Sequence, residues 1–598
     1  MSIKNLLVEL FVEELPPKSL KKLGESFASV LSGSLVSQGL VLPGGEVTAF
    51  ASPRRLAVHI ECVIVQAADK PVSQKLMPVK VGLDAEGNAT PALLKKLASL
   101  GAAASVVPNL KREIDGKAEA LFFDSVVAGV KLVDGLQKAL AEALAKLPIA
   151  KVMTYPDPTG DGWPVVNFVR PAHSLVALYG RKIIPVSVLG LTAGNTTMGH
   201  RFEAKVDRIV LEDADNYAHQ LETEGAVIAS FTQRRSEIVR QLSAAAYKEN
   251  LQYIQDDELL DEVTSLVERP NVLTGCFEEI YLEVPQECLI LTMKANQKYF
   301  PLLDAQGKLS NKFLIVSNIS PKDASLVICG NERVVRPRLA DAKFFYDQDR
   351  KKPLDARVLG LSRVVYHNKL GTQGERVERV QAIARAIGMQ LGGEALSLQA
   401  DQAALLAKAD LLTDMVGEFP ELQGIMGRYY AQHDGLSDEV AFAIEDHYKP
   451  RFAGDELPRN LVGVCVALAD KLETLVGMFG IGQIPTGDRD PFALRRHALG
   501  VIRMLIEKQL TLNLSDLLTS AFAGFPTGLL GDAQAEVQTF MFERMGGMMR
   551  EQGYTANQVD AVLCMNPAQI YLVPKQLEAV RAFAALAESA SLAAANKR

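Results

Sequence analysis

Paired cysteines are missing from this sequence. Its six cysteines are scattered over 598 residues, and none stands in a C-x-x-C pair. This spacing excludes a zinc ribbon and gives no sign of a disulfide framework, so the cysteines are typical of small buried side chains in a reducing compartment. No uncharged stretch reaches the ~18 apolar residues of a membrane span. Glutamates also interrupt the apolar run at the N-terminus, which argues against a signal peptide. We therefore expect a cytoplasmic protein without a membrane partner.

The common nucleotide-binding and catalytic motifs are missing too. The sequence contains no G-x-x-x-x-G-K-[ST] run and no G-x-G-x-x-G after a strand pattern. The signature motifs of class I and class II aminoacyl-tRNA synthetases are absent, as are G-x-S-x-G and H-E-x-x-H. We therefore predict no catalytic residue, metal ligand or cofactor on this chain. We expect a scaffold, a binding subunit, or an enzyme whose chemistry does not depend on one of these motifs.

An excess of positive charge is lacking as well. The formal net charge is −7 and the isoelectric point is about 5.8. A protein whose whole surface binds nucleic acid is usually basic. Any contact with RNA must therefore come from local basic patches on an acidic body. The alternative interpretation of this charge balance is an ordinary soluble metabolic enzyme.

The chain is too long for one hydrophobic core, because single cores stop growing near ~250–300 residues. Short strand patterns and helices alternate before residue 350, and the pattern after it is almost wholly helical. We predict a multidomain α+β protein with N-terminal mixed α/β domains followed by a large all-helical half. The expected domains are an N-terminal α/β domain (1–150), a mixed α+β domain (151–349), a helical domain (350–510) and a helical tail (511–598).

Hydrophobic periodicity predicts individual elements. Leu6, Val8, Leu10 and Val12 alternate with a second set of side chains that includes Glu9 and Glu13, which predicts a half-buried strand. The short apolar run 289–293 also predicts a strand. Two apolar stripes, within residues 405–416 and 464–479, have helical spacing and predict helices that face a core.

The densest cationic stretch covers residues 331–352, with seven basic residues against four acidic ones. Arg333, Arg336 and Arg338 lie at its centre. Arginine forms bidentate hydrogen bonds with phosphate oxygens, so this stretch is a candidate site for an RNA backbone. The alternative is a solvated helix face whose charges form ion pairs within the helix, and the sequence leaves both open.

Two shorter segments could also contact RNA. Arg54 and Arg55 stand just before a predicted strand and could reach RNA or a partner protein. Lys294 and Lys298 are followed by aromatic residues at 299 and 300, and this combination of donors and rings suits base stacking.

A third candidate segment lies within residues 487–497. Asp490 and Pro491 predict the N-cap and first position of a helix. Arg495 and Arg496 follow in its first turns, and a helix N-terminus beside arginines suits a phosphate group. The alternative is that this segment only caps and packs a helix.

The helical half contains a hint of a metal site. Phosphohydrolases of the HD type use a His-Asp pair on a helix and a later aspartate to bind divalent ions. Ala409-Asp410 stands where such a pair would be, and Asp470 resembles the later aspartate. Alanine cannot bind a metal, so we predict no metal site. His447 is expected to be a packed or capping histidine.

Many short runs together resemble one family, the β-subunit of bacterial α2β2 glycyl-tRNA synthetases, and the resemblance covers essentially the whole chain. The matching runs are 10–17 (LFVEELPP), 52–56 (SPRRL), 168–171 (FVRP), 199–202 (GHRF), 293–294 with 297–300, 330–345, 370–372, 418–424 (EFPELQG), 469–471 and 490–496 (DPFALRR).

The resemblance implies a division of labour. In this family the α-subunit carries the class II site that forms glycyl-adenylate from ATP with Mg²⁺, and the β-subunit binds and places tRNA(Gly). It also implies a degenerate HD-like domain at 350–510 and a likeness of 151–349 to the β-chain domain of phenylalanyl-tRNA synthetase. Only the first helix of a C-terminal anticodon-binding domain, near 577–598, is expected here.

The sequence therefore predicts a subunit of glycine–tRNA ligase (EC 6.1.1.14). Its partners would be the α-subunit and tRNA(Gly), with no membrane and no DNA, and its predicted tRNA contacts are Arg54, Arg55, Lys294, Lys298, Arg333, Arg336, Arg338, Arg495 and Arg496. Two other functions remain open at this point: a metal-dependent phosphohydrolase of the HD type, and an assembly scaffold that never contacts RNA.

Overall fold

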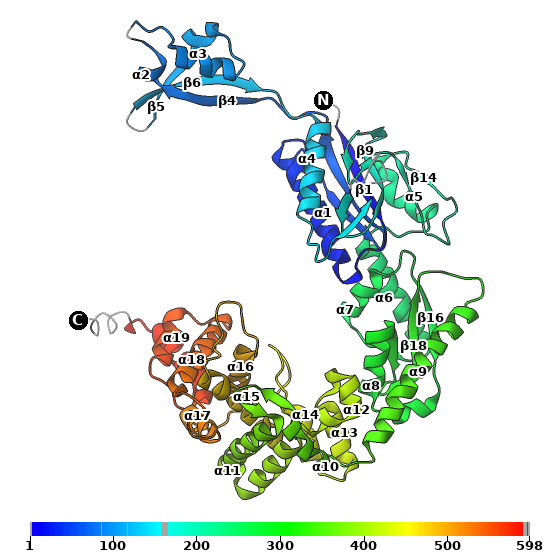
Figure 1. Cartoon of the computed structure of the whole chain (residues 1–598), viewed down its shortest axis with the longest axis vertical. Helices are drawn as coiled ribbons and strands as arrows, with labels where there is room; N and C mark the ends of the chain where they lie inside the picture. Colours follow the sequence, from blue (N-terminus) through cyan, green and yellow to red (C-terminus); the bar gives the residue numbers. More distant parts are fainter. Residues whose placement is uncertain (1–2, 85, 116–117, 157–164, 590–594, 596–598) are drawn as a thin grey trace. The chain divides into compact units, whose positions relative to one another are not determined.

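The protein is mixed α+β, with antiparallel sheets and helices first and a largely helical half after them, so the predicted coarse fold class is confirmed. A computed structural model describes residues 3–84, 86–115, 118–156, 165–589 and 595 (Figure 1). The contacts divide the chain into two compact units. The first unit contains residues 1–276 and 297–332, and the second contains residues 277–296 and 333–598.

The first unit is built on a five-stranded antiparallel sheet of order β10-β9-β1-β3-β2. Two helices, α1 and α4, pack side by side on one face of it (Figure 1). The bounds are β1 Ile3–Val12, β2 Val47–Ser52, β3 Arg55–Ile64, β9 Ala172–Tyr179, β10 Lys182–Ile183, α1 Leu20–Ser37 and α4 Leu132–Ala145.

Strand β1 is buried on both faces, so the predicted half-buried strand is wrong in this respect. One face packs against α1 and α4. The other packs against a smaller core that includes Tyr217 on helix α5 (Tyr217–Thr223). Glu9 is therefore fully buried, and the Tyr217 hydroxyl donates to its Oε2 at 2.5 Å. A carboxylate in a strand pattern indicated a solvent face, whereas here it belongs to a polar group inside the core.

The central sheet combines distant parts of the chain. Strand β9 pairs with β1 in antiparallel register, with Leu6 opposite Tyr179 and Leu10 opposite Leu175. The sheet therefore joins segments on either side of the domain boundary predicted at residue 150. The remaining predicted boundaries stay a prediction. Residues 157–164, part of the loop expected at that boundary, lie outside the described residues.

A smaller sheet of order β4-β6-β5 has its own core. Leu93 and Leu97 on α3 pack with Leu121 on β6. The bounds are β4 Lys70–Pro78, α2 Val79–Gly82, α3 Pro91–Ser99, β5 Lys111–Asp115 and β6 Ala118–Val127. Two-stranded ribbons are formed by β7 Met153–Pro156 with β8 Val165–Phe168, β11 Ser187–Val188 with β12 Leu191–Thr192, and β13 Thr196–Thr197 with β14 Ile209–Val210.

The last sheet of the first unit has the order β15-β17-β18-β16, and helices α6 and α7 share a core with it. The bounds are α6 Phe231–Lys248, β15 Gln252–Tyr253, α7 Asp257–Thr264, β16 Asn271–Cys276, β17 Phe300–Leu303 and β18 Leu309–Ser317.

The second unit is almost wholly helical. Residues 289–293, predicted as a strand, lie instead in helix α8 and the π-helical turn Thr292–Asn296. A short apolar run cannot by itself distinguish a strand from a buried helix. The bounds are α8 Gln286–Leu291, α9 Ser325–Asp349 (its first residues belong to the first unit), α10 Asp355–Val358, β19 Val365–His367, β20 Gly371–Thr372, α11 Gln373–Leu406, α12 Asp414–Glu418, α13 Ile425–His433 and α14 Asp438–Asp446.

Helix α15 (Leu461–Gly480) is the centre of this unit and is buried from Val462 to Phe479, which confirms the predicted stripe 464–479. The stripe 405–416 is not one helix. Helix α11 ends at Leu406, a 3-10 turn covers Ala409–Leu412, and α12 follows. The remaining bounds are α16 Leu494–Glu507, α17 Leu514–Ala523, α18 Gln534–Glu551, α19 Ala556–Leu563 and α20 Val573–Ala584.

The last described helix, α20, covers the start of the expected helix 577–598. Residues 590–594 and 596–598 of that prediction lie outside the described residues. In the part of the chain that the structure describes, no helix combines the length and the apolar character needed to span a bilayer.

Candidate functional site: exposed arginines and a buried charge cluster

The predicted cationic stretch forms most of helix α9. Its buried side chains make a narrow stripe of Val335, Leu339, Ala342 and Tyr346, so most of the helix surface faces solvent. Arg333 and Arg338 are exposed, and neither forms an ion pair with the described residues.

Other cations of the same helix are neutralised by carboxylates. Arg336 Nε lies 2.5 Å from Glu278, and Lys343 Nζ lies 2.7 Å from Glu283 and 3.2 Å from Asp347. Of these contacts, only Lys343–Asp347 lies within the helix, because Glu278 and Glu283 precede it in the chain. Arg333 and Arg338 are the members of this helix whose charge is available to a phosphate.

Arg54 and Arg55 are buried, contrary to their prediction as RNA contacts. Arg54 is 6% exposed and Arg55 is 0% exposed. Glu268 accepts from Arg54 at 2.8 Å and lies 3.7 Å from Arg55. The Arg55 guanidinium also lies 4.0 Å from Glu9. A guanidinium enclosed in this way has no surface for a phosphate, so we correct these two positions to structural residues of the first unit.

Lys294 and Lys298 are both half-buried. The Lys298 ammonium lies 3.1 Å from Glu262. Tyr299, predicted as a stacking ring, is buried and stacks on Phe313 with a centroid separation of 4.8 Å. This aromatic ring therefore belongs to the core and is not available for a base.

Helix α16 begins later than predicted. Its N-cap is Ala493 with φ +54°, not Asp490, and Pro491 lies before the helix. The Asp490 carboxylate nevertheless accepts from the backbone N–H of Leu494 at 2.8 Å and of Arg495 at 3.0 Å, so it caps the helix from three residues before the N-cap. Arg495 donates to the Gly487 carbonyl, whereas Arg496 is exposed and forms no ion pair with the described residues.

The interior of the second unit contains a group of buried charges that we call the Asp470 cluster. Its members are Arg376, Arg379, Lys408, Asp410, Asp470, Lys471 and Glu473. The sequence prediction considered only the two aspartates. The signal for the rest was present in α15, where Asp470, Lys471 and Glu473 interrupt an otherwise apolar helix.

Arginines of α11 bind the carboxylates of α15. Arg376 lies 3.0 Å from Asp470 and 2.9 Å from Glu473, and Arg379 lies 2.8 Å from the other oxygen of Glu473. The two arginines are three residues apart, and so are the two carboxylates, so each pair shares a helix face. The cluster therefore fixes the contact between α11 and α15.

Lysines complete the Asp470 cluster. Lys408 Nζ lies 3.3 Å from Asp470 and 4.0 Å from the centroid of the Tyr448 ring. Lys471 Nζ donates to the carbonyls of His447, Tyr448 and Lys449 at 2.8–3.3 Å. Burial lowers the pKa of both lysines to about 8, although Asp470 opposes the shift, so both carry a charge at neutral pH.

The positions that resemble an HD-type site do not form one. Asp410 Oδ2 accepts from the backbone N–H of Gly424 and Gly427 instead of facing a second ligand. His447 follows the last residue of α14 as its C-cap and is fully buried, as predicted for a packed or capping histidine. Among the described residues, no group of three or more His, Cys, Asp and Glu side chains is close enough to hold a metal ion.

We expect Asp410 to make stability depend on pH. Burial raises its pKa to about 6, above the ordinary 3.8, and the Gly424 N–H only partly opposes the shift. A raised carboxyl pKa stabilises the folded state below the unfolded pKa, and this stability is lost as pH rises through 6. Relative to Asp410→Asn, the wild type should therefore lose about 2 kcal/mol between pH 4 and pH 7.

The measurement is a urea titration of both proteins at several pH values. Asp434→Asn is a matched control on the exposed surface. A free-energy difference between wild type and Asp410→Asn that does not change with pH would contradict the assignment.

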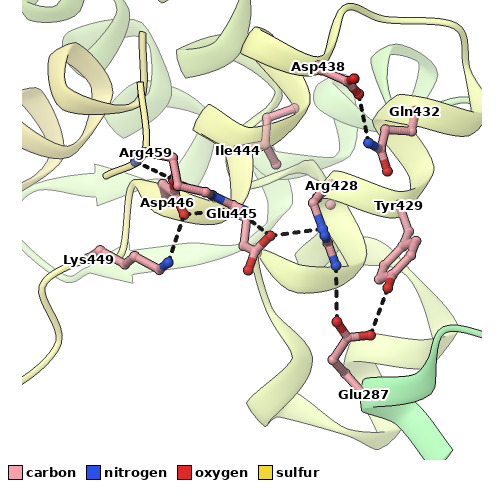
Figure 2. A network of polar contacts seen from close by, with 12 residues as sticks. Glu287, Arg428, Tyr429, Gln432, Asp438, Ile444, Glu445, Asp446, Lys449 and Arg459 are labelled. Atoms are coloured by element: carbon pink, nitrogen blue, oxygen red, sulfur yellow. Dashed lines mark hydrogen bonds and ion pairs between the residues drawn. The ribbon is translucent and has the colours of Figure 1, made fainter. Parts of the chain in front are cut away.

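A second polar network lies on α13 and α14 (Figure 2). Arg428 binds Glu287 of α8 at 3.1 Å and Glu445 at 2.8 Å, so it links three helices. Asp446, fully buried, binds Arg459 at 2.8 Å and Lys449 at 3.2 Å. These two contacts hold both ends of the loop between α14 and α15.

Comparisons with known proteins identify the family. The family model described as glycyl-tRNA synthetase beta subunit matches residues 6–564. The glycine–tRNA ligase beta subunit of Thiobacillus denitrificans is 74% identical over 598 residues, covering 100% of this chain and 85% of the relative. The same subunits of Dechloromonas aromatica and a Janthinobacterium species are each 69% identical, again with 100% and 85% coverage.

This chain belongs to the glycyl-tRNA synthetase beta-subunit family. It is thus a subunit of glycine–tRNA ligase (EC 6.1.1.14), and the resemblance noted in the sequence is confirmed. The alternatives of an HD-type phosphohydrolase and a general assembly scaffold are no longer needed to explain the chain.

Proposed function

We propose that this chain binds tRNA(Gly) in the cytoplasm and positions its 3′ end for aminoacylation at a site carried by an α-subunit, within an α2β2 assembly. ATP and Mg²⁺ are used by the α-subunit. The proposed tRNA contacts of this chain are Arg333, Arg336, Arg338, Arg495 and Arg496, with Lys294 and Lys298 as further positions. The proposed domains are the four predicted from the sequence, with β9 and β10 added to the N-terminal sheet.

The exposure of Arg333 and Arg338 without carboxylate partners is the observation that carries this proposal. An exposed guanidinium with no ion pair is free to form bidentate hydrogen bonds with phosphate oxygens. Such contacts set the register of an RNA without reading its sequence. Binding energy from contacts remote from the reacting atoms can hold the 3′ end in a reactive geometry.

A glycylation assay tests the division of labour. The purified chain with glycine, ATP, Mg²⁺ and tRNA(Gly) should give no glycyl-tRNA, and addition of an α-subunit should give charging. The adenylate reaction, followed by pyrophosphate exchange, should likewise depend on the α-subunit. Charging by this chain alone would refute the proposal.

The double variant Arg333→Gln/Arg338→Gln tests the α9 surface. Removal of two phosphate contacts should reduce the slope of log affinity against log salt concentration by about one unit for each contact. Filter binding of tRNA(Gly) at several salt concentrations measures this slope. Lys343→Met is the matched control on the same helix, because its ammonium is already bound to Glu283 and Asp347. An unchanged slope in the double variant would remove α9 from the RNA surface.

A further inference from the structure

A pocket of about 390 Å³ opens directly above the Asp470 cluster. The buried Lys471, the half-buried His497 and the exposed Arg451 and Arg496 line it. Gln423 and Tyr448 form further parts of its wall. All of these residues belong to the second unit, and the volume is within the range of small-molecule sites.

The charge beneath this pocket is not balanced. The Asp470 cluster has four cations, Arg376, Arg379, Lys408 and Lys471, but only three carboxylates. All seven side chains are buried. Buried charges are normally paired, because leaving one without a counter-charge is costly. Lys471 is the cluster cation that lines the pocket, and it donates only to neutral carbonyls, although the nearby Asp470 and Asp455 carboxylates oppose the lowering of its pKa.

The mouth of the pocket adds to this excess. Arg451 and Arg496 form no ion pair with the described residues, and Glu421 is the acidic side chain of the pocket wall. His497 lies in the wall with its Nδ1 lacking a hydrogen-bond partner among the described residues. Burial and the nearby Lys471 lower the pKa of His497 to about 3, so this imidazole is neutral and can donate a hydrogen bond.

The wall of the pocket is held in place. The loop that contains Arg451 is bound at both ends by Asp446, through Lys449 and Arg459 (Figure 2). Within the loop, the Asp455 carboxylate accepts from the Arg451 backbone N–H at 2.6 Å. On the opposite side, Gly500 of α16 leaves room for the Lys471 side chain, because a Cβ there would lie 2.9 Å from its Cε. The Arg451 backbone and the Lys471 side chain are therefore held in place before any ligand arrives.

We propose that this pocket binds a phosphate monoester of nucleotide size, with the phosphate between Arg451 and Arg496 above the Lys471 and His497 floor. A monoester carries close to two negative charges and ends in three acceptor oxygens, so it can enter a pocket and neutralise more than one cation. A phosphodiester carries one charge and continues in both directions, which suits an open surface. The ligand could be a free mononucleotide or the terminal phosphate of an RNA, and both present the same group.

Binding to the full-length chain is measured by isothermal titration calorimetry with AMP, adenosine, and an RNA trinucleotide with and without a 5′-phosphate. AMP is expected to bind and adenosine to bind at least about tenfold more weakly, equal to about 1.4 kcal/mol. Tighter binding of the phosphorylated trinucleotide than of AMP would identify an RNA end as the source of the ligand. The reverse order would identify a free nucleotide.

The variant Arg496→Met should weaken AMP binding about tenfold, and Arg503→Met on the same helix should not, because Arg503 is already paired with Glu507 at 2.7 Å. Arg496 is exposed and Arg503 is half-buried, so circular dichroism verifies the folding of both variants. Equal affinity for AMP and adenosine, no heat of binding with AMP, or equal effects of the two variants would each overturn the proposal. Arg496 is also one of the proposed tRNA contacts, but these readouts involve neither charging nor the α9 arginines, so they can fail while the α9 test of tRNA binding succeeds.

Discussion

Glu473→Gln is expected to lower the stability of the second unit by about 3–5 kcal/mol, because removal of one partner of a buried ion pair leaves the other charges uncompensated. Glu473 is fully buried and binds Arg376 with one oxygen and Arg379 with the other. A glutamine side chain has nearly the same shape, but its amide carries no charge and presents a donor to one of the two guanidinium groups. The expected loss is therefore electrostatic and not a packing effect.

Hydrogen exchange at amides of α11 and α15 measures this loss, because exchange reports the unit that unfolds even in a chain with two units. The control is Glu507→Gln, which breaks the partly exposed ion pair with Arg503. This change should lower the free energy of unfolding by less than about 1 kcal/mol. The combined variant Arg376→Met/Arg379→Met/Glu473→Leu should lower the free energy of unfolding less per substituted residue than Glu473→Gln does, because apolar side chains can replace a whole buried network. Equal stability of Glu473→Gln and wild type would show that water or a rearrangement compensates the arginines.

Arg55→Met is expected to lower the stability of the first unit by about 3–5 kcal/mol while leaving the salt dependence of tRNA binding unchanged. Arg55 is fully buried, lies near Glu9 and Glu268, and donates to the Met198 carbonyl at 2.7 Å. Its loss would leave Glu9 and Glu268 with less positive charge in a buried site. Lysine should not restore the stability, because one ammonium cannot reproduce the planar fork of a guanidinium.

Two measurements separate the structural role of Arg55 from a role in RNA binding. Hydrogen exchange at β1 and β3 reports the stability, and filter binding of tRNA(Gly) at several salt concentrations reports phosphate contacts. Arg181→Met is the control, since this arginine is exposed and its contact with Asp213 is 3.5 Å long. A reduced salt slope in a folded Arg55→Met protein would restore the original prediction that this residue contacts RNA.

The cationic side chains show how far sequence reasoning could go. The sequence shows where basic residues are dense, but it does not show whether each arginine is exposed, paired or buried. Arg333 and Arg338 are exposed. Arg336 forms an ion pair with Glu278, and Arg55 is buried in the core. The partners of these side chains lie tens to hundreds of residues away in the chain, and no local pattern encodes such pairs.

The composition of the Asp470 cluster, and with it the candidate pocket, could not be derived from the sequence either. Arg376 and Glu473 are separated by 97 residues, and Lys408 lies on a third segment. The charged residues inside an apolar helix indicated a buried polar site, but not its composition. The pocket above the cluster depends further on a loop held by Asp446 and on the side of α16 that carries Arg496.

By itself, the sequence determined the mixed α+β first half, the helical second half, the absence of the common activation motifs and, through its many short runs, the family. Periodicity and motifs are local patterns, so they can be recognised in the linear order of residues. The tertiary structure alone decided that Glu9 and Arg55 are internal, that Asp410 caps backbone N–H groups instead of binding a metal, and that four cations meet three carboxylates beneath a pocket. Electrostatic energy depends on distance and burial, and both arise only when remote segments pack together.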